Sequence, residues 1–96
     1  MTAIDLAARL AACFLATPTT LVENATLLHI AAGLHEVEHL AESVGPRRGV
    51  HSALLRLSKR GLVELRSGML GQPNTYHLTP EGKAYIRTEI LPFFAA

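Results

Sequence analysis

The sequence of 96 residues predicts a mainly α-helical fold with one small two-stranded β-hairpin, in the order α-α-α-α-β-β-α. Three observations lead to this fold class. Apolar residues recur at helical spacing in five segments, the spacing changes to that of strands only between residues 62 and 78, and Gly or Pro separates the segments. The length and the hydrophobic fraction of 49% fit one domain, residues 1–96, with one core.

Four helices are predicted before the hairpin. Their apolar residues follow the i, i+3, i+4 spacing of an amphipathic helix over residues 2–16, 20–32, 35–44 and 48–60. Thr2 is a suitable N-cap for the first helix. The breaks between segments fall at Pro18, Gly33, Gly45-Pro46 and Gly61, because glycine accepts left-handed backbone and proline cannot continue a helix.

The hairpin is predicted where the helical spacing ends. Residues 62–65 read as one strand, residues 67–74 as a turn-rich loop, and residues 75–78 as the antiparallel partner. Thr79 and Pro80 then mark the start of a last helix, since threonine caps a helix and proline is favoured at its first position. This helix is expected to run to about Ile90, ahead of Pro92.

Positive charge is concentrated in one part of the chain. The formal net charge is only +1, from nine Lys and Arg residues against eight Asp and Glu. Residues 1–45 carry a net charge of −4, whereas residues 46–66 hold six of the nine basic residues and a net charge of +5. Because such a cluster attracts phosphate, it indicates a nucleic-acid contact along the helix predicted at 48–60. A solvated helix face is the alternative.

Three stretches carry a resemblance to known proteins. VEHLAESVG (37–45) is similar to the first helix of a helix-turn-helix, VHSALLRLSKRGLVE (50–64) to a recognition helix that runs into a wing strand, and YHLTPEGKAYI (76–86) to the second wing strand and the helix after it. In this order they resemble the winged helix-turn-helix regulators of the MarR and PadR type. The resemblance implies a transcriptional regulator, and more specifically a repressor, that binds double-stranded DNA and is not an enzyme.

The candidate DNA-binding residues lie on the outward face of the basic helix and at its two ends. They are Arg47, Arg48, His51, Ser52, Arg56, Lys59, Arg60 and Arg66. We expect His51, Ser52 and Arg56 to read bases, because an arginine can donate two hydrogen bonds to guanine. Lys59, Arg60 and Arg66 are expected to contact phosphate. Arg47 and Arg48, at the start of the helix, can reach phosphates or base edges.

The resemblance also implies a homodimer on a palindromic operator, held by the N- and C-terminal helices. The candidate dimer residues are Leu6, Leu10, Phe14, Ile86, Ile90, Phe93 and Phe94. They are more apolar than a small domain should leave exposed. The alternative is that they fill the core of the single chain.

A second function remains open because the loop at residues 67–74 has no basic residue and exposes Met69 and Leu70. Wings of the resembling family are usually rich in arginine. A winged-helix module that binds a protein partner through the wing, with Leu55 contributing, is therefore the alternative to DNA binding.

The segment His35-Glu36-Val37-Glu38-His39 matches the H-E-x-x-H motif of zinc proteases. No third ligand follows at a family spacing and the short chain leaves no room for a substrate cleft, so we reject a hydrolase. His35 and His39, with Cys13 or a residue of a partner chain, remain a minor alternative as a metal-sensing site. The preferred interpretation has no metal and no cofactor.

The remaining expectations concern location and ligands. No run approaches the ~18 apolar residues that a membrane span needs, and the N-terminal segment lacks the basic start of a signal peptide. A cytoplasmic protein without a membrane partner is expected. The single Cys13 is interpreted as a buried thiol. No effector pocket is expected, because a chain this short has little apolar volume to spare.

Overall fold

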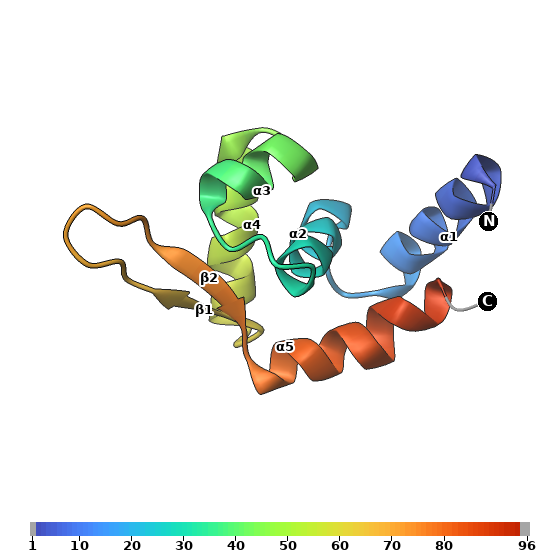
Figure 1. Ribbon diagram of the computed structural model, residues 1–96. Coiled ribbons are helices and arrows are strands. Elements are labelled where there is room, and N and C mark those ends of the chain that lie inside the picture. Colours follow the sequence, from blue (N-terminus) through green and yellow to red (C-terminus); the bar gives the residue numbers. More distant parts are fainter. Residues whose placement is uncertain (1, 95–96) are drawn as a thin grey trace.

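The computed structural model describes residues 2–94, except for the side chain of Phe14. Its helices are α1 (Ala3–Ala16), α2 (Leu21–Ala31), α3 (Val37–Val44), α4 (Arg47–Lys59) and α5 (Pro80–Tyr85), and its strands are β1 (Val63–Arg66) and β2 (Thr75–Leu78) (Figure 1). After α5 the chain continues as a π-helical segment, Ile86–Ile90, and a 3-10 turn, Leu91–Phe93. The predicted fold class and element order are confirmed.

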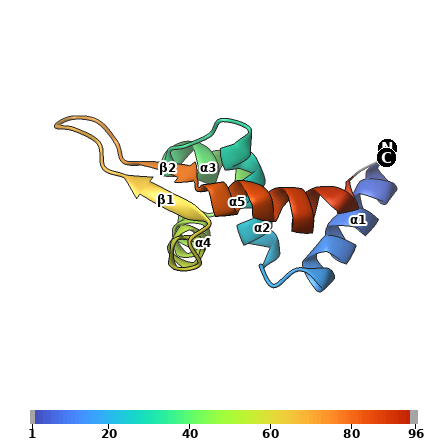
Figure 2. The ribbon, with the colours of Figure 1, turned by 90° about the horizontal axis from the view of Figure 1, so that it is seen from below.

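The hairpin and α1 lie at opposite ends of an elongated molecule of 45 × 25 × 20 Å. Between them, α2, α3 and α4 pack against one another, and α5 with the segment after it runs from the base of the hairpin to α1 (Figures 1 and 2). None of the helices in residues 2–94 is both long and apolar enough to cross a membrane.

Three threonines begin helices in the way that the sequence suggests. Thr2 and Asp5 form a reciprocal capping box, in which each side chain accepts the backbone N–H of the other residue. Thr20 accepts the N–H of Glu23 at the start of α2, and Thr79 accepts the N–H of Gly82 at the start of α5. The predicted caps at Thr2 and Thr79 are confirmed.

Most predicted boundaries differ from the observed ones by one or two residues, and the last helix is α-helical only to Tyr85 before it continues as a π-helix to Ile90. Two of these differences have a clear local cause. Helix α3 begins at Val37 rather than at residue 35, because the carbonyl oxygen of His35 accepts the N–H of Tyr76 at 2.8 Å and so belongs to the contact with β2. Strand β1 begins at Val63 rather than at residue 62, because the N–H of Leu62 donates to the carbonyl of Leu57 and closes the end of α4.

The core lies where α2, α3 and α4 meet. Val50, Leu54 and Leu57, apolar residues of α4 at helical spacing, are fully buried, and they share one cluster with Leu27 of α2 and Leu40 of α3. Tyr76 of β2 and Ile86 after α5 extend the same cluster to the hairpin and the C-terminal segment. The orientation of α4 is therefore set by its apolar stripe.

The hairpin pairs Val63 with Leu78 and Arg66 with Thr75 in an antiparallel register. Its tip is a turn in which the N–H of Gln72 donates to the carbonyl of Met69 at 2.8 Å. Gly71 has a φ of +81° there, a left-handed conformation that favours glycine. Asn74 accepts the N–H of Gly68 through its Oδ1 atom at 3.0 Å and ties the two sides of the loop together.

Gly82 marks the closest approach between α5 and the start of the hairpin. A β-carbon at this position would lie 2.0 Å from the carbonyl oxygen of Leu62, which is backbone and cannot rotate away. Gly49 is a matched contrast, since it is also helical and a β-carbon there would meet nothing within 4 Å.

We expect Gly82→Ala to lower the free energy of unfolding by about 1–3 kcal/mol, because α5 must move away from Leu62. Gly49→Ala should raise it by about 0.5–1 kcal/mol, because alanine favours the helix and meets no obstacle. Urea unfolding followed by circular dichroism measures both. Equal effects of the two substitutions would contradict this account of the α5 contact.

Candidate nucleic-acid interface

The exposed face of α4 follows from its buried one. Val50, Ala53, Leu54 and Leu57 are fully buried, so the residues on the opposite side of the helix face away from the core. That outward stripe, spaced by four and three residues, consists of Arg48, Ser52, Leu55 and Lys59. Leu55 is 50% exposed on it. A helix of this kind, about 10–12 Å across with its side chains, fits the major groove of duplex DNA.

The candidate basic residues fall into two groups by their contacts. Arg48 and Lys59 are exposed, and no hydrogen bond or ion pair joins either of them to another residue of the described chain. The others have partners: Arg47 pairs with Glu38 at 2.6 Å, Arg56 with Glu23 at 2.9 Å, Arg66 with Glu64 at 2.8 Å, and Arg60 donates to the carbonyl of Pro18 at 3.1 Å. His51 is exposed and Ser52 is partly buried.

The ion pairs differ in the environment of the carboxylate. Glu38 and Glu64 are well exposed, so their pairs with Arg47 and Arg66 lie in water. The side chain of Glu23 is only 4% exposed, whereas its partner Arg56 is 49% exposed. An exposed pair is worth about 0–1 kcal/mol and exchanges partners easily, but a buried carboxylate that loses its cation is strongly unfavourable.

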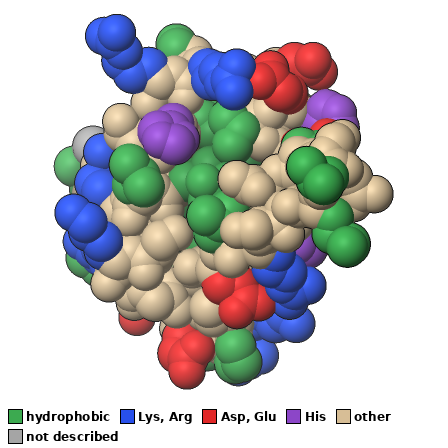
Figure 3. All heavy atoms as spheres, turned by 90° about the vertical axis from the view of Figure 1, so that its left-hand side faces the viewer, with side chains coloured by type: hydrophobic (Ala, Val, Ile, Leu, Met, Phe, Trp, Pro, Cys, Tyr) green, Lys and Arg blue, Asp and Glu red, His purple; other side chains and the backbone are tan. Residues whose placement is uncertain are grey.

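The wing is apolar at its tip. Met69 and Leu70 are 81% and 104% exposed, as the sequence predicts, and basic charge reaches the hairpin only at Arg66 in the last position of β1. Figure 3 views the molecule from this end and shows Lys and Arg side chains in separate groups around the face, with hydrophobic side chains between them. The positive charge of this end of the molecule therefore lies on α4 and at its ends rather than at the wing tip.

The H-E-x-x-H segment does not lie on one helix face. His35 precedes α3, where its ring stacks on His77 at a centroid distance of 4.3 Å and its Nδ1 lies 3.0 Å from the carbonyl oxygen of Tyr76. His39 lies within α3 and pairs with Glu36 at 3.2 Å. The expectation that both histidines share the helix is wrong, and within residues 2–94 no cluster of three or more His, Cys, Asp or Glu side chains could hold a metal.

The candidate dimer residues are divided between the core and the surface. Ile86 and Ile90 are 5% and 0% exposed and fill the core of the single chain, as the alternative interpretation expected. Leu6 is exposed, Leu10 is partly buried on α1, and Phe93 and Phe94 pack partly buried against the core. The side chain of Phe14 lies outside the described residues. The structure adds two exposed apolar residues of α1 that sequence reasoning missed, Ile4 and Leu15, at 81% and 82%.

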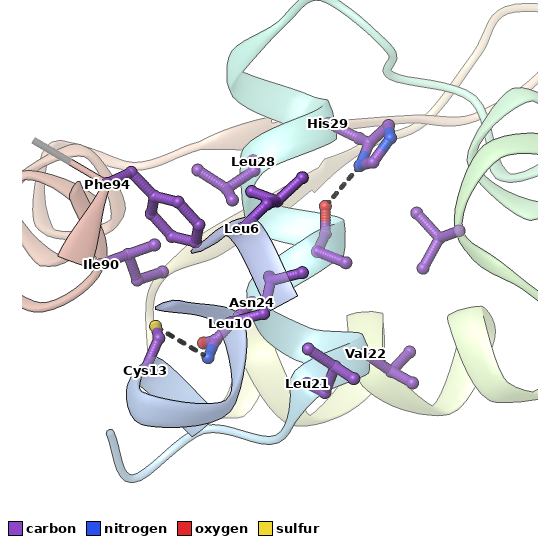
Figure 4. Close-up of a pocket in the computed structure, with 12 residues that line it drawn as sticks. Leu6, Leu10, Cys13, Leu21, Val22, Asn24, Leu28, His29, Ile90 and Phe94 are labelled. Carbon is purple, nitrogen blue, oxygen red and sulfur yellow. Dashed lines mark hydrogen bonds between the residues drawn. The ribbon is translucent and has the colours of Figure 1, made fainter. Parts of the chain in front are cut away.

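An apolar cavity of about 470 Å³ lies where α1, α2 and the C-terminal segment meet. Figure 4 shows Leu6, Leu10 and Leu28 around it, with Ile90 and Phe94 closing one side. The expectation that so short a chain has too little apolar volume for a pocket is therefore wrong. The cavity exists because α1 and the C-terminal segment extend beyond the three-helix core instead of packing flat against it.

Cys13 lies at the edge of this cavity and is buried, as expected. Burial raises the pKa of its thiol, although a hydrogen bond from Thr17 opposes the shift. Its sulfur accepts a long hydrogen bond of 3.7 Å from the amide of Asn24, which also donates to Thr17 at 3.1 Å (Figure 4). A raised thiol pKa lowers the fraction of reactive thiolate at neutral pH.

Glu23 is the site residue that the sequence did not reveal. A weak signal was present, because an acidic residue three positions after Thr20 fits the first turn of a helix. Its carboxylate pairs with Arg56 of α4, which is 33 residues later in the sequence. The two side chains meet only because α2 packs on α4.

Comparison with solved structures identifies a similar fold. BpsR of Bordetella bronchiseptica, whose structure was determined to explain how 6-hydroxynicotinic acid regulates its DNA binding, superposes with a TM-score of 0.73 at 18% sequence identity. The match covers 95% of this chain and 69% of the BpsR chain. No protein-family model matches the sequence, and no curated protein matches it. The chain therefore has the winged helix-turn-helix fold. At this level of identity the similarity shows the fold alone.

The stacked histidines at the base of the wing give a pH-dependent prediction. Burial lowers the pKa of His77 from its ordinary 6.5, and the charges of Arg66 and His35 lower it further while Glu64 opposes them. A histidine whose pKa is lowered in the folded state stabilises the fold above its unfolded pKa, and that contribution is lost as the pH falls. The melting temperature should therefore drop on acidification from about pH 7 to about pH 5.

His77→Phe keeps a ring against His35 but cannot be protonated, so we expect its melting temperature to fall less over the same pH range. Thermal unfolding by circular dichroism at a series of pH values measures the difference. His29, His39 and His51 are common to both proteins and cancel in the comparison. His35 interacts with His77, so the difference reports the stacked pair. An identical pH dependence of the two proteins would exclude His77 as the titrating group.

Proposed function

We propose that this chain is a transcriptional regulator that binds double-stranded DNA with α4 in the major groove. The observation that carries the proposal is the outward stripe of α4, where Arg48 and Lys59 are exposed at its two ends and neither has a hydrogen-bond or ion-pair partner among residues 2–94. The buried stripe on the opposite side holds that face outward on α2 and α3. The hairpin follows α4 directly and lies beside it as the wing.

The charges of the interface support a contact with phosphate. The two exposed pairs, Arg47–Glu38 and Arg66–Glu64, contribute little to stability, so a phosphate can replace either carboxylate. Arg60 and Lys59 extend the basic surface at the C-terminal end of α4. In this arrangement we expect the basic residues other than Arg56 to position the protein on phosphate, and His51, Ser52 and Arg56 to contact base edges.

The fold comparison supports the same kind of function. BpsR binds DNA, and the match covers 95% of the present chain. The alternative of a protein partner at the wing rests on the exposed apolar residues Met69, Leu70 and Leu55. The basic outward face of α4 has no role in that alternative.

We also propose that the protein acts as a homodimer through α1 and the C-terminal segment. Ile4, Leu6 and Leu15 expose apolar surface along α1, next to an apolar cavity that the single chain leaves open. A two-fold partner that covers this surface would place a second α4 on the same side of the duplex, which suits a palindromic operator. A dimer seated on its operator obstructs the promoter, so repression is the expected outcome.

Binding to duplex DNA of random sequence over a salt series tests the proposal. Affinity should fall steeply with salt, and Arg48→Ala or Lys59→Ala should each reduce the salt slope by about 0.9. Arg87→Ala is the matched control, because it removes one exposed charge from the C-terminal segment rather than from α4. A failure of the wild-type protein to bind at low salt would exclude the regulator and direct attention to the wing.

The dimer is tested separately by the mass of the protein in solution. Ile4→Glu or Leu15→Glu should convert a dimer to monomers without unfolding the chain, since both side chains are more than 80% exposed. Leu70→Glu is the control, because it introduces the same charge at an equally exposed apolar residue of the wing. Analytical ultracentrifugation distinguishes the states. A monomeric wild-type protein would contradict this part of the proposal.

A further inference from the structure

Glu23 and Arg56 form the one ion pair of the described chain in which a buried carboxylate holds an arginine of α4. The Oε1 atom of Glu23 accepts hydrogen bonds from Arg56 Nε at 2.9 Å and from the hydroxyl of Thr20 at 3.2 Å. Its Oε2 atom is buried and has no hydrogen-bond partner among the described residues. Among these contacts, Arg56 is therefore the only cation that balances the charge of the buried Glu23 carboxylate.

This arrangement restricts what Arg56 can do on contact with DNA. An arginine that left Glu23 for a phosphate would leave an uncompensated buried charge, which is strongly unfavourable. The pair therefore has to persist in a complex. An arginine has five N–H donors in a rigid plane, and Glu23 uses the one on Nε, so the terminal Nη groups remain available on a side chain that is 49% exposed.

Arg56 also lies next to the face that would meet the duplex. It follows Ser52 by four residues and precedes Lys59 by three, so it is a surface neighbour of two members of the outward stripe. The side of α4 that carries Arg56 faces the first turn of α2. There the position of Glu23 in the helix and a hydrogen bond from the Thr20 hydroxyl hold its carboxylate in place.

We propose that Glu23 is a positioning residue for DNA recognition: it holds Arg56 by Nε so that the two Nη groups of Arg56 read one base pair in the major groove. The inference rests on the proposed function and adds the residue that sets specificity. The pair is electrically neutral, so Arg56 contributes directional hydrogen bonds rather than general attraction for phosphate. Arg56 therefore differs from Arg48 and Lys59, which contribute charge.

Two substitutions of Glu23 separate the charge from the hydrogen bond. Glu23→Gln removes the charge but keeps an acceptor for Arg56 Nε, whereas Glu23→Met fills the same space and removes both. Each should free the charge of Arg56 and raise the salt slope of non-specific binding by about 0.9. Base preference at one position of each half-site should fall by about tenfold or more in Glu23→Met and by less in Glu23→Gln.

The experiment selects duplexes from a randomised pool with the full-length wild-type protein and each variant, then measures binding to the selected and to a scrambled duplex over a salt series. Arg56→Ala should lose the preference at the same base pair, and Glu23→Met should cause no further loss in an Arg56→Ala background. Glu89→Gln is the control, since it removes one exposed carboxylate far from α4. Thermal unfolding of every variant measures any loss of stability. If Glu23 had only a structural role, its substitution would lower stability but leave base preference unchanged.

The outcomes distinguish the inference from the function on which it rests. A wild-type protein that binds no duplex overturns both. A wild-type protein that selects a sequence, and a Glu23→Met variant that selects it equally well, overturn the positioning role alone. If Glu23→Met does not fold, Arg56→Lys replaces it, because it keeps a cation against Glu23 but lacks the planar fork. An unchanged base preference in Arg56→Lys would also overturn the inference.

Discussion

The packing of α4 on α2 and α3 determines every other property of the interface. Val50, Leu54 and Leu57 are completely buried, and their spacing allows the helix only one rotation about its axis. That rotation places Arg48, Ser52, Leu55 and Lys59 outward together and turns Arg56 toward the start of α2. A change in one of the three buried residues would alter the direction of all the exposed ones, because close-packed cores shift side chains as a unit.

Burial of polar groups in and next to the first half of α2 is the second constraint, and it connects α1 with α5. Thr19, Glu23, Asn24 and Thr26 are almost fully buried within or next to this helix. Thr19 bonds to Asn24 and lies 2.8 Å from the hydroxyl of Tyr85, while Asn24 reaches Cys13 and Thr17 at the end of α1. Because buried polar groups need particular partners, this network fixes α1 and the C-terminal segment more specifically than apolar contacts would.

The sequence was sufficient for the fold because its local signals agree with one another. The apolar spacing, the glycines and prolines between segments, and the caps at Thr2 and Thr79 all indicate the same elements. The apolar stripe of α4 is buried, whereas α1 leaves much of its apolar surface exposed. The boundaries at His35 and Leu62 were missed because contacts with other elements decide them. The candidate site was predicted only as a set of charges. Which arginines have partners depends on Glu23, Glu38 and Glu64 meeting them in the folded chain.

These partners change how the charge of the chain should be interpreted. Residues 46–66 carry a net charge of +5, but three of their arginines face carboxylates, one of them a Glu within the same segment. In the proposed complex, these internal pairs would reduce the general attraction for DNA below what the net charge of the segment suggests, so hydrogen bonds of fixed direction would supply a large part of the selectivity. Exposed pairs give way to phosphate, whereas a pair with a buried carboxylate does not. The burial of its carboxylate partner would thus decide whether an arginine contributes general attraction for phosphate or base specificity.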